Sequence, residues 1–109
     1  MAFDALEVAL ELVRALRAPL AVLRQHDRKL AEQATDAVNS VALCLDEGRR
    51  RQGKDRLHLF RVAAGSAAET RTALRLAEAW GYLKAEALAY PYALLDRELA
   101  MLWRLAPPT

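Results

Sequence analysis

Apolar residues recur at three- and four-residue steps in four successive segments of this chain, and no other feature limits its fold as strongly. A step of three or four residues returns to the same face of an α-helix, so each segment predicts an amphipathic helix. The predicted helices span residues 3–24, 28–48, 55–80 and 85–105. Short connections place consecutive helices side by side in opposite directions. The pattern therefore predicts an all-α fold, an antiparallel up-down-up-down four-helix bundle.

The composition supports this fold and limits the function. Isoleucine is absent, and Gly and Pro number four each, so residues that favour strands or break helices are scarce. The length of 109 residues suits one domain, residues 1–109. The single Cys excludes an intramolecular disulfide. No apolar run approaches the roughly 18–20 residues of a membrane span, and the first residues carry acids where a secretory signal is basic. We therefore expect a cytoplasmic protein with no membrane segment.

Two prolines leave the course of the first and fourth helices open. Pro19 interrupts the first helix, but the apolar stripe continues beyond it, which favours a kinked helix to about Arg24. A helix that ends near Arg17 is the alternative. The fourth helix either starts near Ala85 and kinks, or has Pro91 in its first turn, where the missing N–H matters least.

The same period predicts which side chains face the core. They are Leu6, Leu10, Val13, Leu16, Leu20 and Leu23; Leu30, Ala34, Ala37 or Val38, Val41 and Leu45; Leu57, Phe60, Ala64, Ala67, Leu74 and Ala77; and Leu88, Tyr92, Leu95, Leu99 and Leu102. Asp27 is the expected N-cap of the second helix. Gly48 and Gly81 are expected to end the second and third helices in the left-handed conformation. Gly65, in the middle of the third helix, is best explained by the close approach of a neighbouring helix.

Further apolar residues lie off these faces. They are Val8, Leu12, Leu43, Leu59, Val62, Leu76, Leu94, Met101 and Leu105. One small bundle needs fewer, and contiguous apolar patches mark interfaces. The surplus predicts self-association.

A basic loop connects the second and third predicted helices. It holds Arg49, Arg50, Arg51, Lys54 and Arg56 within eight residues, in a chain whose net charge is only +2. Such a cluster can neutralise phosphates, with salt-dependent and sequence-tolerant binding, so these five are the candidate nucleic-acid-binding residues. The alternative is a solvated helix end whose arginines pair with nearby acids. No aromatic residue interleaves the cluster, so base stacking is not suggested here.

Residues 40–83 resemble the central region of a bacterial family of four-helix-bundle proteins encoded in intervening sequences of large-subunit ribosomal RNA genes. The accessory variability protein of diversity-generating retroelements looks related to that family. The resemblance is carried by Ser40, Glu47, Gly48, Arg51, Phe60, Ala63, Gly65, Ser66, Glu69, Gly81, Tyr82 and Leu83. Cys44 departs from it, because the family pattern has Asn there, and Asp46 stands in place of Ala. The resemblance implies a homo-oligomer, most often a pentameric ring, with nucleic-acid binding as a further option and no known enzymatic activity.

No constellation of residues points to catalysis. His58 and Asp55 share a helix face, but di-iron bundles use two Glu-x-x-His pairs and this chain has one such pair, with Asp in place of Glu. Cys44 is expected to be a small buried residue. We expect no catalytic residues, no metal and no cofactor. The leading hypothesis is a non-catalytic, oligomeric scaffold that presents a basic surface to a partner protein. An RNA- or DNA-binding protein that uses the basic loop is the second hypothesis, and a metal-binding or enzymatic bundle is the third.

Overall fold

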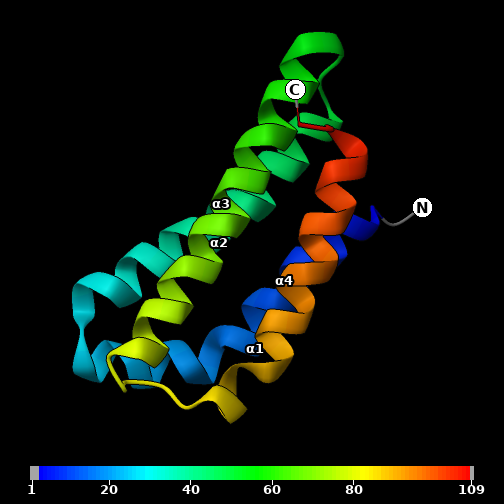
Figure 1. Ribbon diagram of the computed structural model, residues 1–109. Helices are drawn as coiled ribbons and strands as arrows, with labels where there is room; N and C mark the ends of the chain where they lie inside the picture. Colours follow the sequence, from blue (N-terminus) through cyan, green and yellow to red (C-terminus); the bar gives the residue numbers. More distant parts are fainter. Residues whose placement is uncertain (1–2, 109) are drawn as a thin grey trace.

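The computed structural model describes residues 3–108, and four α-helices make up most of this part of the chain. They are α1 (Asp4–His26), α2 (Arg28–Arg49), α3 (Gly53–Ala79) and α4 (Ala85–Leu105). Both α1 and α3 pack against α2 and against α4, so the helices form a closed square of antiparallel neighbours about 42 Å long (Figure 1). This confirms the predicted all-α four-helix bundle. The ends of the predicted domain, residues 1–2 and 109, lie outside the described residues.

The helix ends follow the local sequence. The side chain of Asp27 accepts a hydrogen bond from the backbone N–H of Leu30 at 3.0 Å, which confirms the predicted N-cap. Gly81 has φ +81°, and the N–H of Tyr82 donates to the carbonyl of Ala77 at 2.8 Å, the pattern of a Schellman motif. Gly81 therefore ends α3 as predicted.

Both prolines lie inside continuous helices. Pro19 is buried within α1, which runs on to His26, so the alternative ending near Arg17 is excluded. Pro91 lies in the second turn of α4, which starts at Ala85. None of the helices between residues 3 and 108 is both long and apolar enough to cross a membrane.

Gly48 has a different role from the predicted one. It lies inside α2, and the positive φ angles belong to Gly53 and Gly81, so the expectation that Gly48 ends the helix in the left-handed conformation is wrong. A Cβ atom at Gly48 would lie 2.7 Å from Cε1 of Phe60. The glycine is needed because the buried ring of Phe60, on α3, occupies the space where a side chain would be.

The core side of α1 is rotated from the predicted stripe. Its buried residues are Ala5, Val8, Ala9, Leu12, Leu16, Pro19 and Leu23, whereas Leu10 is 37% exposed and Leu6, Val13 and Leu20 are half-buried. Two adjacent stripes of α1 satisfy the helical period. The predicted stripe also carries Arg17 and Arg24, and the stripe that faces the core carries no charge. Charge therefore selects between two stripes of similar hydrophobicity.

The other predicted faces are largely confirmed. Those of α2 and α4 are buried except for Tyr92, which is half-buried, and on α3 Leu57 and Ala64 are also half-buried. The apolar residues predicted to lie off the core faces differ in their burial. Val8, Leu12 and Leu94 are buried, so their assignment to the surface was wrong, while Leu59, Met101 and Leu105 are half-buried. Leu43, Val62 and Leu76 are 70%, 37% and 45% exposed.

Gly65 is not explained by packing within the chain. It is exposed, and a Cβ atom built on it would meet nothing within 4 Å, so no helix between residues 3 and 108 makes the predicted close approach. The next residue does make a contact between helices. The hydroxyl of Ser66 donates to the hydroxyl of Ser40 at 2.9 Å, which joins α3 to α2.

We expect Gly48→Ala to lower the free energy of unfolding by about 1 kcal/mol. Overpacking against Phe60 costs about 1–3 kcal/mol, and the higher helix propensity of Ala returns about 1 kcal/mol. Urea denaturation measures this difference. In a Phe60→Leu background the ring is gone, so Gly48→Ala should become neutral or stabilising. Equal destabilisation in both backgrounds would show that Phe60 is not the obstacle.

Candidate functional site

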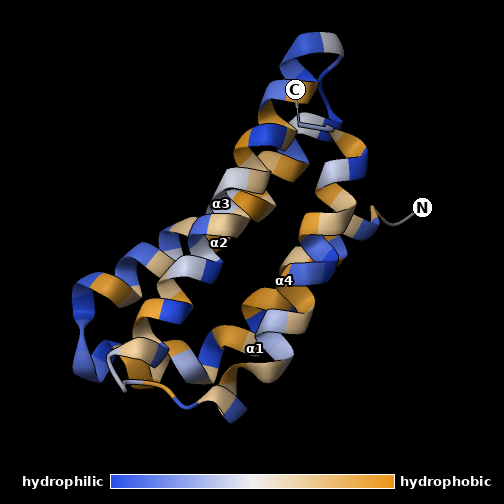
Figure 2. Ribbon diagram, viewed as in Figure 1, coloured by the Kyte–Doolittle hydropathy of each residue, from blue (hydrophilic) through white to orange (hydrophobic). Residues whose placement is uncertain are grey.

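The predicted basic loop lies at one end of the bundle, where the α2–α3 hairpin extends beyond α1 and α4 (Figure 1). The connection between these two helices is strongly hydrophilic (Figure 2). All five predicted residues are exposed there. Arg49 is the last residue of α2, and Lys54 and Arg56 lie in the first turn of α3. The fold thus brings the predicted residues together.

The three consecutive arginines pair with the two acids at the end of α2. Asp46 lies 3.0 Å from both Arg49 and Arg50. Glu47 lies 3.2 Å from Arg50 and 2.5 Å from Arg51. The hydrogen bond from Arg51 to Glu47 raises the pKa of the Arg51 guanidinium above its ordinary value. The guanidinium groups are therefore engaged by acids of the same helix end.

Arg56 has a structural role. Its guanidinium donates to the backbone carbonyl of Gly48 at 3.3 Å and to that of Arg49 at 3.0 Å. The last carbonyls of a helix have no partner within the helix, so Arg56 caps the end of α2 from α3. Lys54 forms no ion pair with any residue between 3 and 108, and it is the most available cation of the five.

The ion pairs of the loop do not prevent it from binding an anion. The side chains of Arg49, Arg50 and Arg51 remain 43%, 64% and 51% exposed. Ion pairs at such exposure contribute little to stability, so a phosphate can replace a carboxylate at little cost. Five cations against three acids leave two net positive charges in residues 46–56. The loop is a weak electrostatic site in a single chain.

The predicted His58–Asp55 pair lies beside this loop. Both residues line a shallow hollow of about 220 Å³ together with Glu47, Arg51 and Leu59. Within residues 3–108, no group of three or more His, Cys, Asp or Glu side chains is arranged to hold a metal ion.

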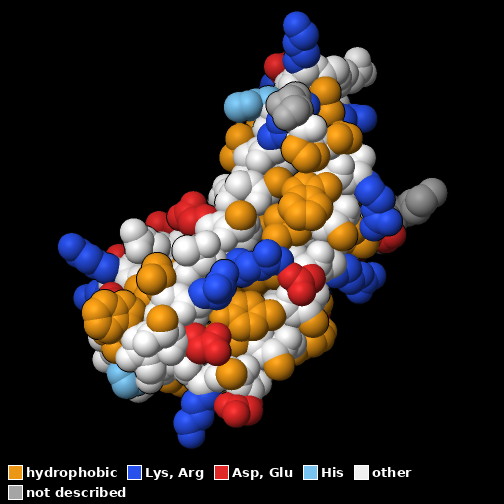
Figure 3. Space-filling view, in the orientation of Figure 1, with side chains coloured by type: hydrophobic (Ala, Val, Ile, Leu, Met, Phe, Trp, Pro, Cys, Tyr) orange, Lys and Arg blue, Asp and Glu red, His pale blue; other side chains and the backbone are white. Residues whose placement is uncertain are grey.

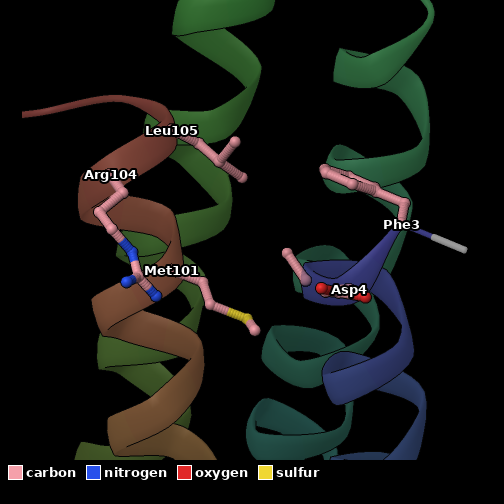
Figure 4. A pocket seen from close by; sticks show the side chains of 6 residues that line it. Phe3, Asp4, Met101, Arg104 and Leu105 are labelled. Carbon is pink, nitrogen blue, oxygen red and sulfur yellow. The ribbon is translucent and has the colours of Figure 1, made fainter.

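A second hollow, of about 370 Å³, lies between the start of α1 and the end of α4. It is lined by Phe3, Asp4, Ala5, Met101, Arg104 and Leu105. Figure 4 shows that Asp4 and Arg104 come from opposite walls, with the side chain of Met101 between them. One acid, one base and an apolar floor in an open hollow do not define a class of ligand.

Cys44 has a neutral hydroxyl as its hydrogen-bond partner. It is half-buried rather than buried as predicted, and its Sγ lies 3.7 Å from Oγ of Ser40. A reactive thiol needs a base or a positive charge beside it, and the hydroxyl of Ser40 is neutral.

The comparisons with known proteins decide the family. A sequence model described as 23S rRNA-intervening sequence protein matches residues 3–104. The chain belongs to this family. The resemblance in the α2–α3 region therefore extends over nearly the whole of this intervening sequence protein, including α1 and most of α4.

A solved structure shares the fold of this intervening sequence protein. It is the crystal structure of a protein of unknown function of the S23 ribosomal protein family from Bacteroides thetaiotaomicron VPI-5482. The TM-score is 0.84 at 19% sequence identity, and the match covers 95% of this chain and 99% of that one. None of the curated proteins compared with the chain matches it.

One buried titratable group, Glu98 on α4, was not predicted from the sequence. Glu98 is 0% exposed, and neither carboxylate oxygen has a hydrogen-bond partner within residues 3–108. The other buried polar residue in this part of the chain is Thr70, whose hydroxyl donates to a carbonyl of its own helix. A signal was present, because Glu98 lies one turn from Leu95 and one turn from Leu102 on a buried stripe.

Burial raises the pKa of Glu98 to about 8, and the neighbouring charge of Arg97 offsets only part of this. In the unfolded chain a Glu carboxyl has a pKa of about 4.3. Between these two values the folded protein holds a proton that the unfolded chain has lost. The contribution of neutral Glu98 to the free energy of unfolding is therefore fully present below its pKa in the unfolded chain. It is lost as the pH rises through its pKa in the folded protein.

We expect the wild-type protein to lose up to about 1 kcal/mol of stability per pH unit, relative to Glu98→Gln, as the pH rises from about 5 to about 8. Gln has the same shape and no charge, so this variant should lack the contribution. Urea denaturation across this pH range measures both. Asp36→Asn, at an exposed acid of α2, is the matched control and should follow the wild type. Parallel curves for wild type and Glu98→Gln would contradict a neutral, buried Glu98.

Proposed function

We propose that this intervening sequence protein is a non-catalytic helical scaffold of the cytoplasm that assembles into a homo-oligomer and presents a basic surface to a partner. The observation that supports this most is the exposure of Leu43, Val62 and Leu76, at 70%, 37% and 45%, on α2 and α3. Large apolar side chains that are left exposed are available for contact with another copy of the chain. A pentameric ring is the assembly that the family resemblance implies.

The outer stripe of α3 supports contact with another copy. Val62, Gly65, Glu69 and Leu76 recur at helical steps along it, and all four are exposed. Gly inside a helix costs about 1 kcal/mol relative to Ala, and no contact among the described residues offsets this cost at Gly65. A neighbouring helix over Gly65 would offset it. Glu69 forms no ion pair within residues 3–108 and is available for one between subunits.

Assembly would strengthen the basic surface. A single loop carries a small net positive charge, and each added copy would contribute the same charge at the same end of its bundle. Fields of like charges add, and the summed potential attracts acidic partners more strongly than one loop does. The partner of the scaffold would therefore be a macromolecule with an acidic or phosphate-rich surface.

We expect the wild-type protein at micromolar concentration to have a mass several times that of one 12.1 kDa chain. The double variant Leu43→Glu/Leu76→Glu should have the mass of one chain, because two charges would be buried without partners in the interface. Multi-angle light scattering measures both masses. Leu43→Met/Leu76→Met is the matched control and should assemble like the wild type. A monomeric wild-type protein that is fully helical would contradict the scaffold proposal.

The second candidate function is RNA or DNA binding by the basic loop. The exposure of Arg49, Arg50 and Arg51 favours it, because their weak pairs with Asp46 and Glu47 can be exchanged for phosphates. Lys54 would add a cation that needs no exchange. Arg56 would contribute less, since it caps α2.

We expect the triple variant Arg49→Ala/Arg50→Ala/Arg51→Ala to bind RNA and DNA fragments more weakly and with a smaller salt dependence. Each phosphate that the variant no longer binds should reduce the slope of log K against log salt by about 0.7–0.9. Fluorescence anisotropy at several salt concentrations measures the slope. Arg14→Ala/Arg17→Ala, which removes exposed arginines of α1, is the control. An unchanged slope in the triple variant would count against the loop.

A further inference from the structure

A stack of three aromatic rings lies at the end of the bundle opposite the basic loop. The ring of Tyr82 lies 5.2 Å from that of His26 and 6.2 Å from that of Trp80, with planes inclined by 10° and 15°. These values are typical of offset-stacked rings. His26 ends α1, while Trp80 and Tyr82 belong to the turn after α3. The stack therefore joins two connections that are far apart in the sequence.

Trp80 leaves most of its indole open to solvent. It is 68% exposed, and among the large apolar side chains described only Leu43 is more exposed. An indole held in a stack is already oriented, so its free surface can receive another flat ring without further ordering. Bases of single-stranded nucleic acids stack on such platforms, whatever their sequence, because every base has a π-face.

Three cations lie within three residues of the stack along the chain. Arg28 and Lys29 are the first residues of α2, where the helix dipole disfavours positive charge, and the first turn of α2 holds no acid. Lys84 directly precedes α4. None of the three forms an ion pair within the described residues. Because consecutive Cα atoms are about 3.8 Å apart, Arg28 and Lys84 each lie within about 8 Å of a residue of the stack, Cα to Cα.

An apolar groove opens beside the stack. It has a volume of about 530 Å³ and runs between α1 and α4, with Tyr82 and Lys84 among its lining residues. The remaining lining includes Pro19, Val22 and Tyr90. Ligand sites typically measure about 300–1,000 Å³, so the groove has room for a nucleoside beside Tyr82. Figure 3 shows hydrophobic and basic side chains next to each other at this end, at the lower left of the view.

We propose that this end of the bundle, the aromatic tip formed by His26, Trp80, Tyr82, Arg28, Lys29 and Lys84, binds single-stranded nucleic acid. An unpaired base stacks on the free surface of Trp80. Phosphates on either side of that base lie against Arg28, Lys29 and Lys84. The basic loop differs in both respects, because Arg49, Arg50 and Arg51 are paired with acids and no aromatic residue lies between the loop's cations in the sequence. The aromatic tip does not depend on the loop, which lies at the other end.

Anisotropy titrations of the full chain test the stacking contact. The probes are fluorescein-labelled oligo(U) and oligo(dT) of about 12 nucleotides, within the usual span of single-strand sites. Trp80→Leu should weaken binding about 5-fold to 100-fold, the range for removal of one stacked base. Trp80→Phe keeps an aromatic face and should retain most of the affinity. Trp103→Leu is the matched control, since Trp103 is also exposed, at 55%, but lies on α4 near its other end.

Two further readouts separate stacking from charge. In a Trp103→Phe background Trp80 is the remaining tryptophan, and oligo(U) should quench its fluorescence as a base stacks on it. Arg28→Ala/Lys29→Ala should reduce the salt slope by about 0.7 for each phosphate that is no longer bound, as expected for single strands. A duplex of the same length should bind more weakly, because its bases are not free to stack.

Several results would overturn the proposal. They are wild-type affinity in Trp80→Leu, absence of quenching at saturating oligo(U), and absence of binding to either oligonucleotide at low salt. Weaker binding in Arg49→Ala/Arg50→Ala/Arg51→Ala together with an unaffected Trp80→Leu would assign the interaction to the basic loop instead. A changed assembly mass in Trp80→Leu, with unchanged affinity, would assign Trp80 to the contact between copies. The scaffold proposal survives each of the first three results.

Discussion

Phe60 of α3 packs onto the backbone of α2 at Gly48, and this contact limits how closely α2 and α3 can approach. The approach brings the hydroxyls of Ser66 and Ser40 within hydrogen-bond distance, and it places Arg56 over the last carbonyls of α2. These contacts hold α2 and α3 in a fixed register, and a short connection joins the two helices. The hairpin can therefore extend beyond α1 and α4 and still present its cations in a fixed arrangement (Figure 1).

The seams around α4 are of a different kind. Tyr90 donates to Glu11 of α1, Tyr92 donates to Glu78 of α3, and Arg71 of α3 pairs with Asp96, all near the surface. The interior of the same helix carries Glu98, which has no partner among the described residues. Surface contacts thus orient α4, while its buried face contains a group that opposes burial whenever it is charged. The α4 seam is the part of the fold whose strength depends on proton concentration.

Helical periodicity predicted the fold because it is a local property that tertiary packing did not override. Helix ends were signalled by nearby residues such as Asp27 and Gly81. The period alone could not predict which side of α1 faces the core, since two stripes fit it. The positions of Arg17 and Arg24 decided between the two stripes. The role of Gly48 could not be predicted because its constraint comes from Phe60 on another helix. The stack of His26 on Tyr82 joins residues 56 positions apart in the sequence. The spacing of residues in the sequence does not predict a contact between residues separated by two whole helices.

The connections of an up-down-up-down bundle alternate between its two ends, and here those ends differ chemically. One end carries guanidinium groups paired with carboxylates. The other carries stacked aromatic rings and basic groups that form no ion pair within residues 3–108, and the bundle measures 42 Å along its long axis. In any ring whose members run parallel to the central axis, these ends would form two rims of unlike character. Such a ring would have two chemically different surfaces. A molecule bound to one rim would leave the other rim free to bind a second molecule of different chemistry.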